Sequence, residues 1–457
     1  MSTLVVIGGS DAGIMAGLRA KEKDPHMGVS MLVADAFVNF SICGLPFYLS
    51  GEVPDWRRLA HRSLDEIQAS GIDVHLNTRA VAIDPVQHKV LGRQEDGTDK
   101  EWAYDRLVIA TGSESVRPGI GGLELPGVFT LHTMADGFHV AQFMERHKPA
   151  RALIIGAGYI GLEMAEALNR RGVEVIMVEQ LPAILPTIDE GLAHHLRVYL
   201  EGKHVNVHTG VRVEKIERTA EGLIVYGDGG FLREVDMVLV VVGVKPVTGL
   251  AVNAGITLGA GRAIHVDRFM ATNQEDIFAA GDCAETYHRL LETESYLPLG
   301  TTAHKQGRVA GENAAGGHLE FEGSLGTQVV KVFDWVVART GIRDEDATVS
   351  GYDPLSTQIT GWDHKVYYPG AQEITIRITG DKKTGQLLGA SLLGHRDAAV
   401  AKRVDIFAMA LYNRMRVEDL LHVDLSYTPP LGSPWDVIQM AAADWLKHAA
   451  GNRTGGD

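Results

Sequence analysis

Cysteine is scarce in this chain: Cys43 and Cys283 are the only two among 457 residues. Two cysteines cannot build a disulfide framework, and their scarcity suits a reducing compartment, so we expect a cytoplasmic protein. No group of histidines and cysteines has the spacing of metal ligands, so we expect no metal site.

Long apolar runs and an excess of positive charge are also missing. The longest apolar run, residues 237–244, is far too short to span a bilayer. The apolar N-terminal run lacks the basic leader of a secretion signal, and we interpret it as a strand. A formal net charge of −15 argues against a nucleic-acid partner. We therefore expect neither a membrane nor a nucleic acid as a partner.

Glycine, in contrast, is abundant, and it is placed at a turn near the N-terminus. An apolar run leads into Gly8, Ser10 and Gly13, a helical pattern follows, and the next apolar run ends at Asp35, 22 residues after Gly13. This order of strand, glycine turn, helix, strand and acid is the dinucleotide-binding fingerprint. Serine replaces the second glycine, so this match alone is weak, and an ordinary tight turn is the alternative.

The same pattern recurs in full at residues 151–180. Gly156, Gly158 and Gly161 open the helix, and Glu179 ends the next strand 18 residues after Gly161. The first glycine makes the turn, the second admits a pyrophosphate, and the third packs helix on strand. The helix N-terminus then faces the phosphates. We interpret this second fingerprint as a nucleotide site.

Two further strand ends indicate how the sites are completed. Residues 104–113 form a buried-strand pattern ending in a Thr-Gly turn, and residues 277–285 form another ending in Gly281 and Asp282. With these stretches the chain resembles, over essentially its whole length, the two-dinucleotide flavoprotein disulfide reductases. The resemblance implies FAD at the first fingerprint, NAD(H) at the second, and a hydrogen bond from Asp282 to the flavin's ribityl chain.

The resemblance also implies a set of cofactor-binding residues. For FAD they are Gly8, Ser10, Asp11, Gly13, Asp35, Ser41, Ala82, Ala110, Thr111, Gly112, Gly281, Asp282, Thr302 and Ala303. For the pyridine nucleotide they are Gly156, Gly158, Tyr159, Ile160, Gly161, Glu179 and Gly243.

The expected fold class is α/β, with two Rossmann-like dinucleotide-binding domains and a C-terminal α+β dimerisation domain. The FAD domain is expected at 1–113 and 246–322, with the NAD(H) domain inserted at 114–245. The interface domain is expected at 323–457, where alternating strand patterns precede two helical stretches. The resemblance implies a homodimer.

Glu179 predicts which pyridine nucleotide binds. A carboxylate at this strand end accepts hydrogen bonds from the ribose hydroxyls and repels a 2′-phosphate. The following residues, Gln180, Leu181 and Pro182, provide no arginine for such a phosphate. We therefore predict NADH rather than NADPH.

Cys43 lies in the stretch "NFSICGLPFY", residues 39–48. The C-x-x-x-x-C motif of two-cysteine relatives is excluded because Tyr48 holds the second position. A lone buried cysteine is usually an inert apolar side chain. Here Gly44 and Pro46 indicate a loop entering a helix, whose first amides are expected to stabilise a thiolate. The motif also resembles the single-cysteine branch of the family, which implies a redox-active Cys43 beside the flavin.

Two features separate the chemistries of that branch. Asp11 stands where the peroxidases and oxidases of the family carry histidine, which argues against peroxide or oxygen as substrate; helix capping is its alternative role. Residues 364–371 and 424–436 resemble two stretches of coenzyme A disulfide reductases in which tyrosines approach the partner's cysteine. Tyr427, and either Tyr367 or Tyr368, are therefore expected to protonate a leaving thiolate. Ordinary interface aromatics are the alternative.

The sequence thus predicts an NADH-dependent FAD flavoprotein that reduces a low-molecular-weight disulfide or persulfide through Cys43. Coenzyme A is left open as a ligand; cations that could hold its phosphates are Arg19, Lys21, Arg58, His61 and Arg62. One alternative is an NADH oxidase or peroxidase that cycles Cys43 through sulfenic acid. Another is an NADH-binding redox sensor with negligible turnover.

Overall fold

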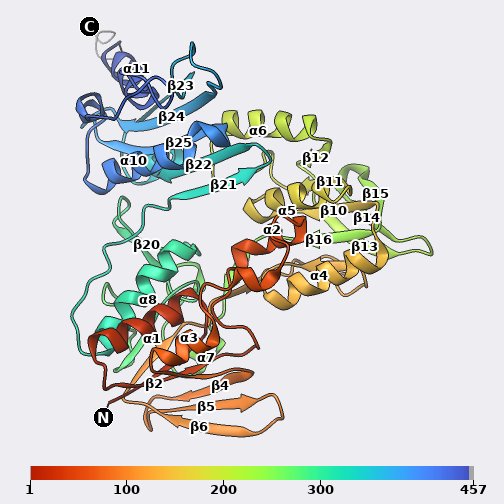
Figure 1. Ribbon diagram of the computed structural model, residues 1–457, viewed down its shortest axis with the longest axis vertical. Helices are drawn as coiled ribbons and strands as arrows, with labels where there is room; N and C mark the ends of the chain where they lie inside the picture. The colour runs from red at the N-terminus through yellow and green to blue at the C-terminus, as the bar shows by residue number, and fades with distance from the viewer. Residues whose placement is uncertain (1, 452–457) are drawn as a thin grey trace.

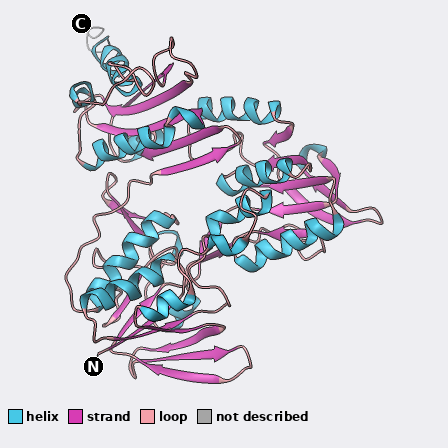
Figure 2. Ribbon diagram, viewed as in Figure 1, coloured by secondary structure: helices cyan, strands magenta, loops and turns pink. Residues whose placement is uncertain are grey.

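A computed structural model describes residues 2–451, so the outermost ends of the expected first and third domains lie outside the described residues. The chain forms three parts, each built on one main sheet with its helices (Figure 1). The N-terminal sheet lies at one end, a sheet of central residues lies to its side, and the C-terminal sheet lies at the opposite end. Helices cover the faces of the sheets (Figure 2). This arrangement confirms the predicted α/β class.

The first main sheet has the strand order β18-β7-β1-β2-β3, and every pairing in it is parallel. Its strands are β1 (Thr3–Ile7), β2 (Gly28–Leu32), β3 (Ile72–His75), β7 (Arg106–Ile109) and β18 (Ile277–Ala279). Strand β18 comes from far along the chain, so this sheet joins two segments that are separated in the sequence by the strands of the second main sheet. Parallel sheets of this kind bind ligands beyond the carboxyl ends of their strands.

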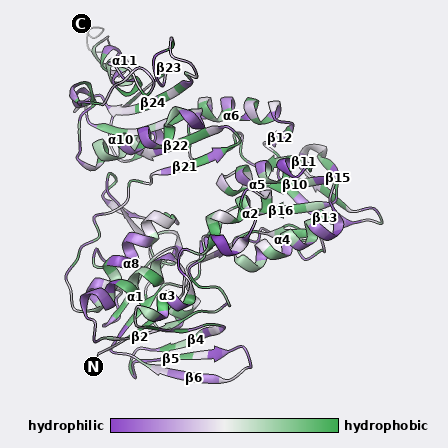
Figure 3. Ribbon diagram, in the orientation of Figure 1, coloured by the Kyte–Doolittle hydropathy of each residue, from purple (hydrophilic) through white to green (hydrophobic). Residues whose placement is uncertain are grey.

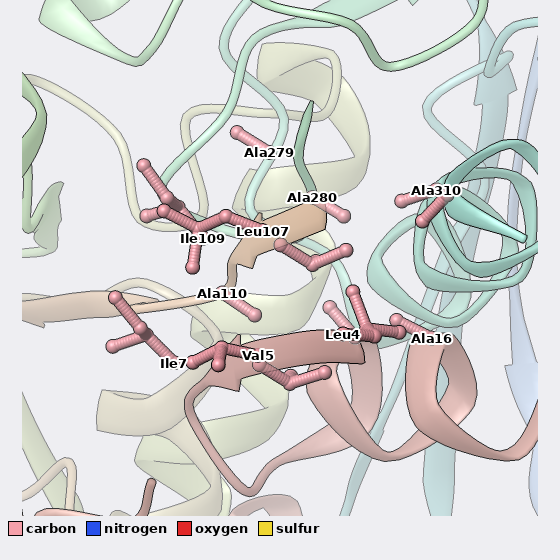
Figure 4. Close-up of a cluster of buried hydrophobic side chains, with 14 of the residues drawn as sticks. Leu4, Val5, Ile7, Ala16, Leu107, Ile109, Ala110, Ala279, Ala280 and Ala310 are labelled. Atoms are coloured by element: carbon pink, nitrogen blue, oxygen red, sulfur yellow. The ribbon is translucent and has the colours of Figure 1, made fainter. Parts of the chain in front are cut away.

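Helices α1 (Asp11–Lys23) and α8 (Gly300–Ala314) pack closely against each other over this sheet. The core between them is made of short and branched apolar side chains from both helices and from the central strands, as Figure 4 shows. Gly307 and Gly311 of α8 permit this approach, because a Cβ on either would lie 2.2 Å from a carbonyl oxygen of α1. The first glycine turn is thereby anchored beside the start of α8.

The second main sheet is also wholly parallel, with the order β12-β11-β10-β16-β9. Its strands are β9 (Val128–Thr130), β10 (Arg151–Ile155), β11 (Glu174–Glu179), β12 (Val205–Thr209) and β16 (Met237–Val240). Helices α4 (Met134–His147), α5 (Tyr159–Arg170) and α6 (Glu190–Gly202) accompany it. The two fingerprints therefore fold into two separate parallel sheets, as expected.

The third main sheet is antiparallel, with the order β21-β22-β25-β24-β23. Its strands are β21 (Gln328–Val332), β22 (Trp335–Gly341), β23 (Pro354–Trp362), β24 (Glu373–Asp381) and β25 (Leu387–His395). Helices α9 (Asp344–Val349), α10 (Val400–Tyr412) and α11 (Val437–Gly451) belong to it. Its β25 is mostly apolar, apart from Ser391 and the terminal His395, because both faces of that strand are buried. Figure 3 shows the hydropathy of each element, with hydrophobic residues in green.

Smaller elements complete the chain. Two three-stranded antiparallel sheets contain β4 (Thr78–Asp84), β5 (Lys89–Gln94) and β6 (Asp99–Ala103), and β13 (Val213–Arg218), β14 (Leu223–Gly227) and β15 (Leu232–Val235). Two-stranded ribbons pair β8 (Ser113–Ser115) with β17 (Val244–Pro246), and β19 (Thr286–His288) with β20 (Thr293–Ser295). Short helices are α2 (Leu45–Ser50), α3 (Leu64–Ala69) and α7 (Gly249–Asn253). Within residues 2–451, no helix combines the length and apolarity needed to cross a membrane.

Candidate active site

The two glycine turns have the same backbone geometry. Gly8 and Gly156 have φ values of +121° and +107°, which only glycine adopts readily. A Cβ on Gly13 would lie 2.0 Å from the carbonyl oxygen of Gly8, and a Cβ on Gly161 would lie 2.1 Å from that of Gly156. The first and third glycines of each fingerprint are therefore required by the protein's own packing.

Gly158 is different, because a Cβ placed on it would meet nothing within 4 Å. It stands immediately before α5, whose first amide groups have no intrahelical acceptor. The fold itself does not require glycine at this point, whereas a pyrophosphate approaching those amides does. Ser10 occupies the corresponding position before α1, with its side chain making no capping hydrogen bond. Both turns thus fit a dinucleotide phosphate.

Glu179 and Asp35, the acids at the end of the second strand of each βαβ unit, accept different hydrogen bonds. Glu179 is 8 % exposed, and its two carboxylate oxygens accept hydrogen bonds from the backbone N–H groups of Ala157 and Leu181, each over 2.9 Å. Asp35 is exposed, and one of its oxygens accepts from the N–H of Phe37 over 2.7 Å. Each carboxylate retains acceptor capacity, because an ionised carboxylate has about four lone-pair sites.

The predicted FAD residues converge on the carboxyl ends of β1, β7 and β18. Gly8 lies against the carbonyl of Ala110, and Gly281 lies against the side chains of Ala12 and Ala303. Thr111 donates a hydrogen bond over 2.6 Å to the carbonyl oxygen of Val247. Segments that are hundreds of residues apart in the chain are therefore brought to one edge of the first sheet.

Asp282 has a hydrogen-bonded neighbour that the sequence did not indicate. The hydroxyl of Ser113 donates to the Asp282 carboxylate over 3.1 Å, and the ring Nε2 of His132 lies 2.8 Å from the carbonyl oxygen of Ser113. Burial raises the pKa of Asp282, and this hydrogen bond counteracts the rise. Because His132 precedes α4 of the second sheet, the contact also joins the two sheets.

The remaining predicted FAD residues are more dispersed. Thr302 is buried in α8, where its hydroxyl donates to Ser324 over 3.3 Å. Ala82 is exposed in β4 of a small antiparallel sheet. Gly112 and Gly243 have φ values of +70° and +114°, and a Cβ on either would meet nothing within 4 Å. Both of these glycines therefore face open space beside the predicted nucleotides.

Cys43 lies in a single 3-10 turn, Ile42–Gly44, that leads into α2. Its side chain is exposed, whereas Cys283 is fully buried and its thiol faces the carbonyl oxygens of Ile109 and Ala280 at 3.4 Å. The sheets that carry the two fingerprints meet here, because α2 packs on α5 of the second sheet (Figure 1). Cys43 is thus the one thiol that a reactant can reach.

The electrostatics of Cys43 correct one expectation. The helix after Cys43 was expected to stabilise a thiolate, but desolvation of the sulfur by the atoms packed around this accessible residue, and the charges of Glu163, Asp11 and Asp282, raise the pKa of the thiol. Helix α2 has only six residues, so its dipole is weak against three carboxylates. Desolvation and these three charges thus hold the pKa of the Cys43 thiol above its ordinary value.

Asp11 and Glu163 are the acids that face this region. Asp11 is the first residue of α1, and the N-cap position belongs to Ser10, so Asp11 is not the capping residue. Burial and the neighbouring charge of Glu166 raise the pKa of Glu163 to about 7, while Lys331 acts in the opposite direction. Sequence reasoning missed Glu163, although its place two residues after Gly161 in the fingerprint helix was a usable signal.

The three predicted tyrosines lie in loops beside the third main sheet: Tyr367 and Tyr368 between β23 and β24, and Tyr427 before α11. Helix α2 of the same chain lies away from this sheet (Figure 1). Tyr367 and Tyr427 are 74 % and 45 % exposed, and both partial desolvation and interaction with the Tyr427 hydroxyl raise the pKa of Tyr367. Tyr368 instead packs its ring edge-on against His364, with centroids 5.9 Å apart. The two predicted loops therefore meet, and Tyr367 is the tyrosine paired with Tyr427.

A buried ion pair connects the two loops that carry Tyr367 and Tyr427. Arg403 of α10 contacts the Asp436 carboxylate at 3.0 Å and donates to the carbonyl oxygen of Asp363 over 2.8 Å. The N–H of Lys365 donates to the carbonyl of Pro429 over 3.3 Å. These contacts fix the relative positions of the two tyrosine-bearing loops.

Comparison with known proteins identifies the family. Residues 2–307 match the pyridine nucleotide-disulphide oxidoreductase family, and residues 327–436 match the dimerisation domain of the same family. The chain belongs to the pyridine nucleotide-disulphide oxidoreductases. It is therefore an oxidoreductase, its fold is the one predicted, and it carries the family's dimerisation domain. Membership in this family implies FAD and a pyridine nucleotide as cofactors.

Among similar curated proteins, an NAD(P)H sulfur oxidoreductase (CoA-dependent) from Pyrococcus furiosus is 33 % identical, covering 96 % of this chain and 98 % of the relative. An NADH oxidase from Methanocaldococcus jannaschii is 31 % identical, covering 97 % and 98 %. Among solved structures, an NAD-dependent persulfide reductase from A. fulgidus superimposes with a TM-score of 0.95 at 34 % identity, covering 98 % of this chain and 84 % of that one.

Proposed function

We propose that the chain is an NADH-dependent FAD flavoprotein that reduces a low-molecular-weight disulfide or persulfide, such as that of coenzyme A, through Cys43. The observation that carries this proposal is the position of Cys43. It is the one exposed thiol, and it lies where the helix after it packs against the helix of the second fingerprint. The names of similar proteins, among them sulfur and persulfide reductases, support the substrate class.

FAD would bind at the first sheet through the glycine turn, Asp35 and Asp282, and NADH at the second through Gly158 and Glu179. Bound flavin supplies the route by which two electrons from NADH reach a disulfide at Cys43. The residues 1–113 and 246–322, 114–245 and 323–457 remain our proposed domain boundaries.

The protein's own part in the reaction begins with the sulfur of Cys43. As a thiolate it attacks one sulfur of RS–SR′, the S–S bond breaks, and R′S⁻ leaves while Cys43 holds RS as a mixed disulfide. The Tyr427 hydroxyl of the partner subunit donates the proton that converts R′S⁻ into R′SH. Two electrons then cleave the mixed disulfide, RS⁻ takes a proton and leaves, and the Cys43 thiolate returns. In this scheme the protein works as a cytoplasmic homodimer.

Replacement of Cys43 tests this scheme. We expect Cys43→Ser to bind both nucleotides but to lose turnover on coenzyme A disulfide, because a serine hydroxyl, unlike a thiolate, does not attack disulfides. The matched control is Cys283→Ser, which alters the thiol that is buried. Wild-type turnover in the Cys43→Ser protein would eliminate the mechanism.

The second candidate function is an NADH oxidase or peroxidase, favoured by the similarity to a protein of that name. There Cys43 would be oxidised to sulfenic acid and reduced again. Turnover on oxygen, peroxide and disulfides under one set of conditions separates the two functions. Negligible turnover on every acceptor, together with an NADH-dependent change in dimer shape, would instead indicate a redox sensor.

A further inference from the structure

The segment that precedes α6 lies beside the glycine turn of the second fingerprint. The N–H of Leu185 donates to the carbonyl oxygen of Ala157 over 2.8 Å, and the hydroxyl of Thr187 donates to that of Tyr159 over 3.1 Å. Ala157 and Tyr159 are the two chain neighbours of Gly158, on which a Cβ would meet nothing within 4 Å. The segment thus contacts both sides of the position that a nucleotide phosphate would approach.

This segment, residues 185–189, is also held by arginines from the third main sheet and its loops. Arg343 lies between β22 and α9, and it donates to the carbonyl oxygen of Pro186 over 2.9 Å. Arg377 of β24 donates to the Asp189 carboxylate over 2.7 Å. The segment is therefore held between the second and third main sheets.

Arg339 of β22 makes a third contact, at the residue that also meets Tyr159. Its guanidinium donates to the carbonyl oxygen of Thr187 over 3.0 Å and to that of Gly341, and within residues 2–451 it forms no ion pair. Burial lowers the pKa of Arg339, and the neighbouring Tyr159 acts in the opposite direction. A buried cation without a carboxylate depends on its carbonyl acceptors, so Arg339 and Thr187 hold each other in place.

The backbone of the segment adds an independent sign that it is firmly held. Leu185 is fully buried, has a φ of +46° and stands directly before Pro186. A left-handed conformation is unfavourable for a bulky residue, and a following proline restricts it further, so it persists only where surrounding contacts impose it. The hydrogen bonds to the turn and to the arginines are such contacts.

The turn needs this support at Gly158. Glycine has the widest backbone freedom of any residue, whereas a binding geometry must be held within about 0.5 Å by the contacts around it. Residues 185–189 restrain both neighbours of Gly158, and the arginines restrain residues 185–189 in turn.

We propose that Arg339 is a positioning residue for pyridine-nucleotide binding. It fixes residues 185–189 and, through them, the phosphate-binding backbone at Gly158. Affinity at the second nucleotide site therefore depends on a side chain of the third main sheet. This inference rests on the proposed nucleotide site and adds to it a residue that lies outside both fingerprints.

A binding measurement tests the proposal without turnover. ADP-ribose carries the pyrophosphate of NADH but no nicotinamide, and calorimetry on the FAD-loaded protein gives its Kd. We expect Arg339→Gln to raise this Kd about threefold to tenfold, because the turn is less well held, and to leave the FAD content unchanged. Equal Kd values in Arg339→Gln and wild type would overturn the proposal, even if the variant melts at a lower temperature.

The kinetic counterpart is a split between KM and kcat. In Arg339→Gln the KM for NADH should rise by a similar factor, while kcat at saturating NADH and the KM for coenzyme A disulfide stay within about twofold of wild type. A general loss of structure would not separate these constants. A fall in kcat with an unchanged KM for NADH would place the effect outside nucleotide binding and refute the positioning role.

Thr187→Val isolates the contact with Tyr159, and it carries the test by itself if Arg339→Gln does not fold. The change removes the hydroxyl donor at nearly constant volume, and we expect the Kd for ADP-ribose to rise about twofold to fivefold. In the double variant R339Q/T187V the two losses should overlap, because both act through one segment. An unchanged Kd in Thr187→Val, or losses that multiply in the double variant, would contradict the proposed path.

Arg197→Gln is the matched control. Arg197 of α6 donates to the carbonyl oxygen of Val207 over 3.4 Å and to the Thr209 hydroxyl over 3.1 Å, both in β12. Its Kd for ADP-ribose should stay within about twofold of wild type, and a loss as large as that of Arg339→Gln would overturn the proposal.

The same measurements separate this inference from the proposed function. Failure of the wild type to bind ADP-ribose would refute the proposed nucleotide site, and this inference with it. Equal binding by the wild type, Arg339→Gln and Thr187→Val would refute this inference alone. Turnover of Cys43→Ser on coenzyme A disulfide bears on the proposed function and leaves the binding result as it stands.

Discussion

The carboxylate of Glu179 accepts a hydrogen bond from the backbone N–H of Ala157 over 2.9 Å, inside the second glycine turn. The acid that ends β11 therefore also holds the turn before α5 in place. If Glu179 also selects NADH, as we propose, one side chain would couple the nucleotide preference to the conformation of the phosphate-binding backbone.

Replacement of Glu179 should reduce the preference for NADH. In Glu179→Gln the negative charge that repels a 2′-phosphate is absent, so we expect the ratio of kcat/KM for NADH to that for NADPH to fall about tenfold, which is about 1.4 kcal/mol. Steady-state kinetics with both nucleotides measures it. Glu174→Gln, at the exposed start of the same strand, is the control. A higher kcat/KM with NADPH in the wild type would contradict the interpretation of Glu179.

Glu163 should make stability depend on pH. Its pKa is raised from 4.5 to about 7, so between these values the unfolded state releases the proton first and the free energy of unfolding falls as pH rises. The free energy of unfolding of Glu163→Gln should not fall in this way. Relative to wild type we therefore expect it to rise by about 1–3 kcal/mol between pH 4 and pH 8. Denaturant titrations at several pH values measure it. Glu190→Gln, on the exposed start of α6, is the control, and parallel pH profiles for Glu163→Gln and wild type would contradict the assignment.

Asp11 should suppress the reactivity of Cys43. Its negative charge contributes to the raised pKa of the thiol, so Asp11→Asn should lower that pKa and increase the thiolate fraction at a given pH. We expect alkylation of Cys43 in the holoenzyme to be about threefold to tenfold faster at fixed pH. The rate is measured against pH by mass spectrometry. Asp65→Asn on α3 controls for a general loss of charge, and an unchanged or slower rate in Asp11→Asn would show that its charge does not reach the thiol.

The ion pair of Lys331 should stabilise the contact between the second and third main sheets. Lys331 pairs with Glu166 of α5, whose side chain is 4 % exposed and also accepts from the N–H of Phe333 over 2.7 Å. Lys331→Met leaves the buried carboxylate of Glu166 with only the more distant cation of Arg170, at 3.4 Å, and we expect a loss of about 1–3 kcal/mol in the free energy of unfolding.

The matched control for Lys331→Met is Lys203→Met, which removes a more exposed pair with Asp334 at the junction of the same two sheets. That change should cost less than about 1 kcal/mol. Thermal unfolding measures both, and equal losses in the two variants would contradict the assigned burial effect.

Local sequence patterns were sufficient for the elements and for the fold class. The glycine spacings, the apolar runs and the strand-ending acids predicted both βαβ units, because a tight turn and a helix start are decided by neighbouring residues. Gly13 and Gly161 illustrate this: each contacts a carbonyl only five residues earlier.

Contacts between distant segments required the folded chain. Ser113 meets Asp282, and the charge of Glu163 reaches Cys43, only in the folded chain. The expected lowering of the thiol pKa was wrong for the same reason: the pattern around Cys43 showed a helix start, but the desolvation and the three carboxylates that raise this pKa come from other elements. The pKa of a group depends on the burial and the charges that its neighbours in space provide, so the local sequence around Cys43 could not predict it.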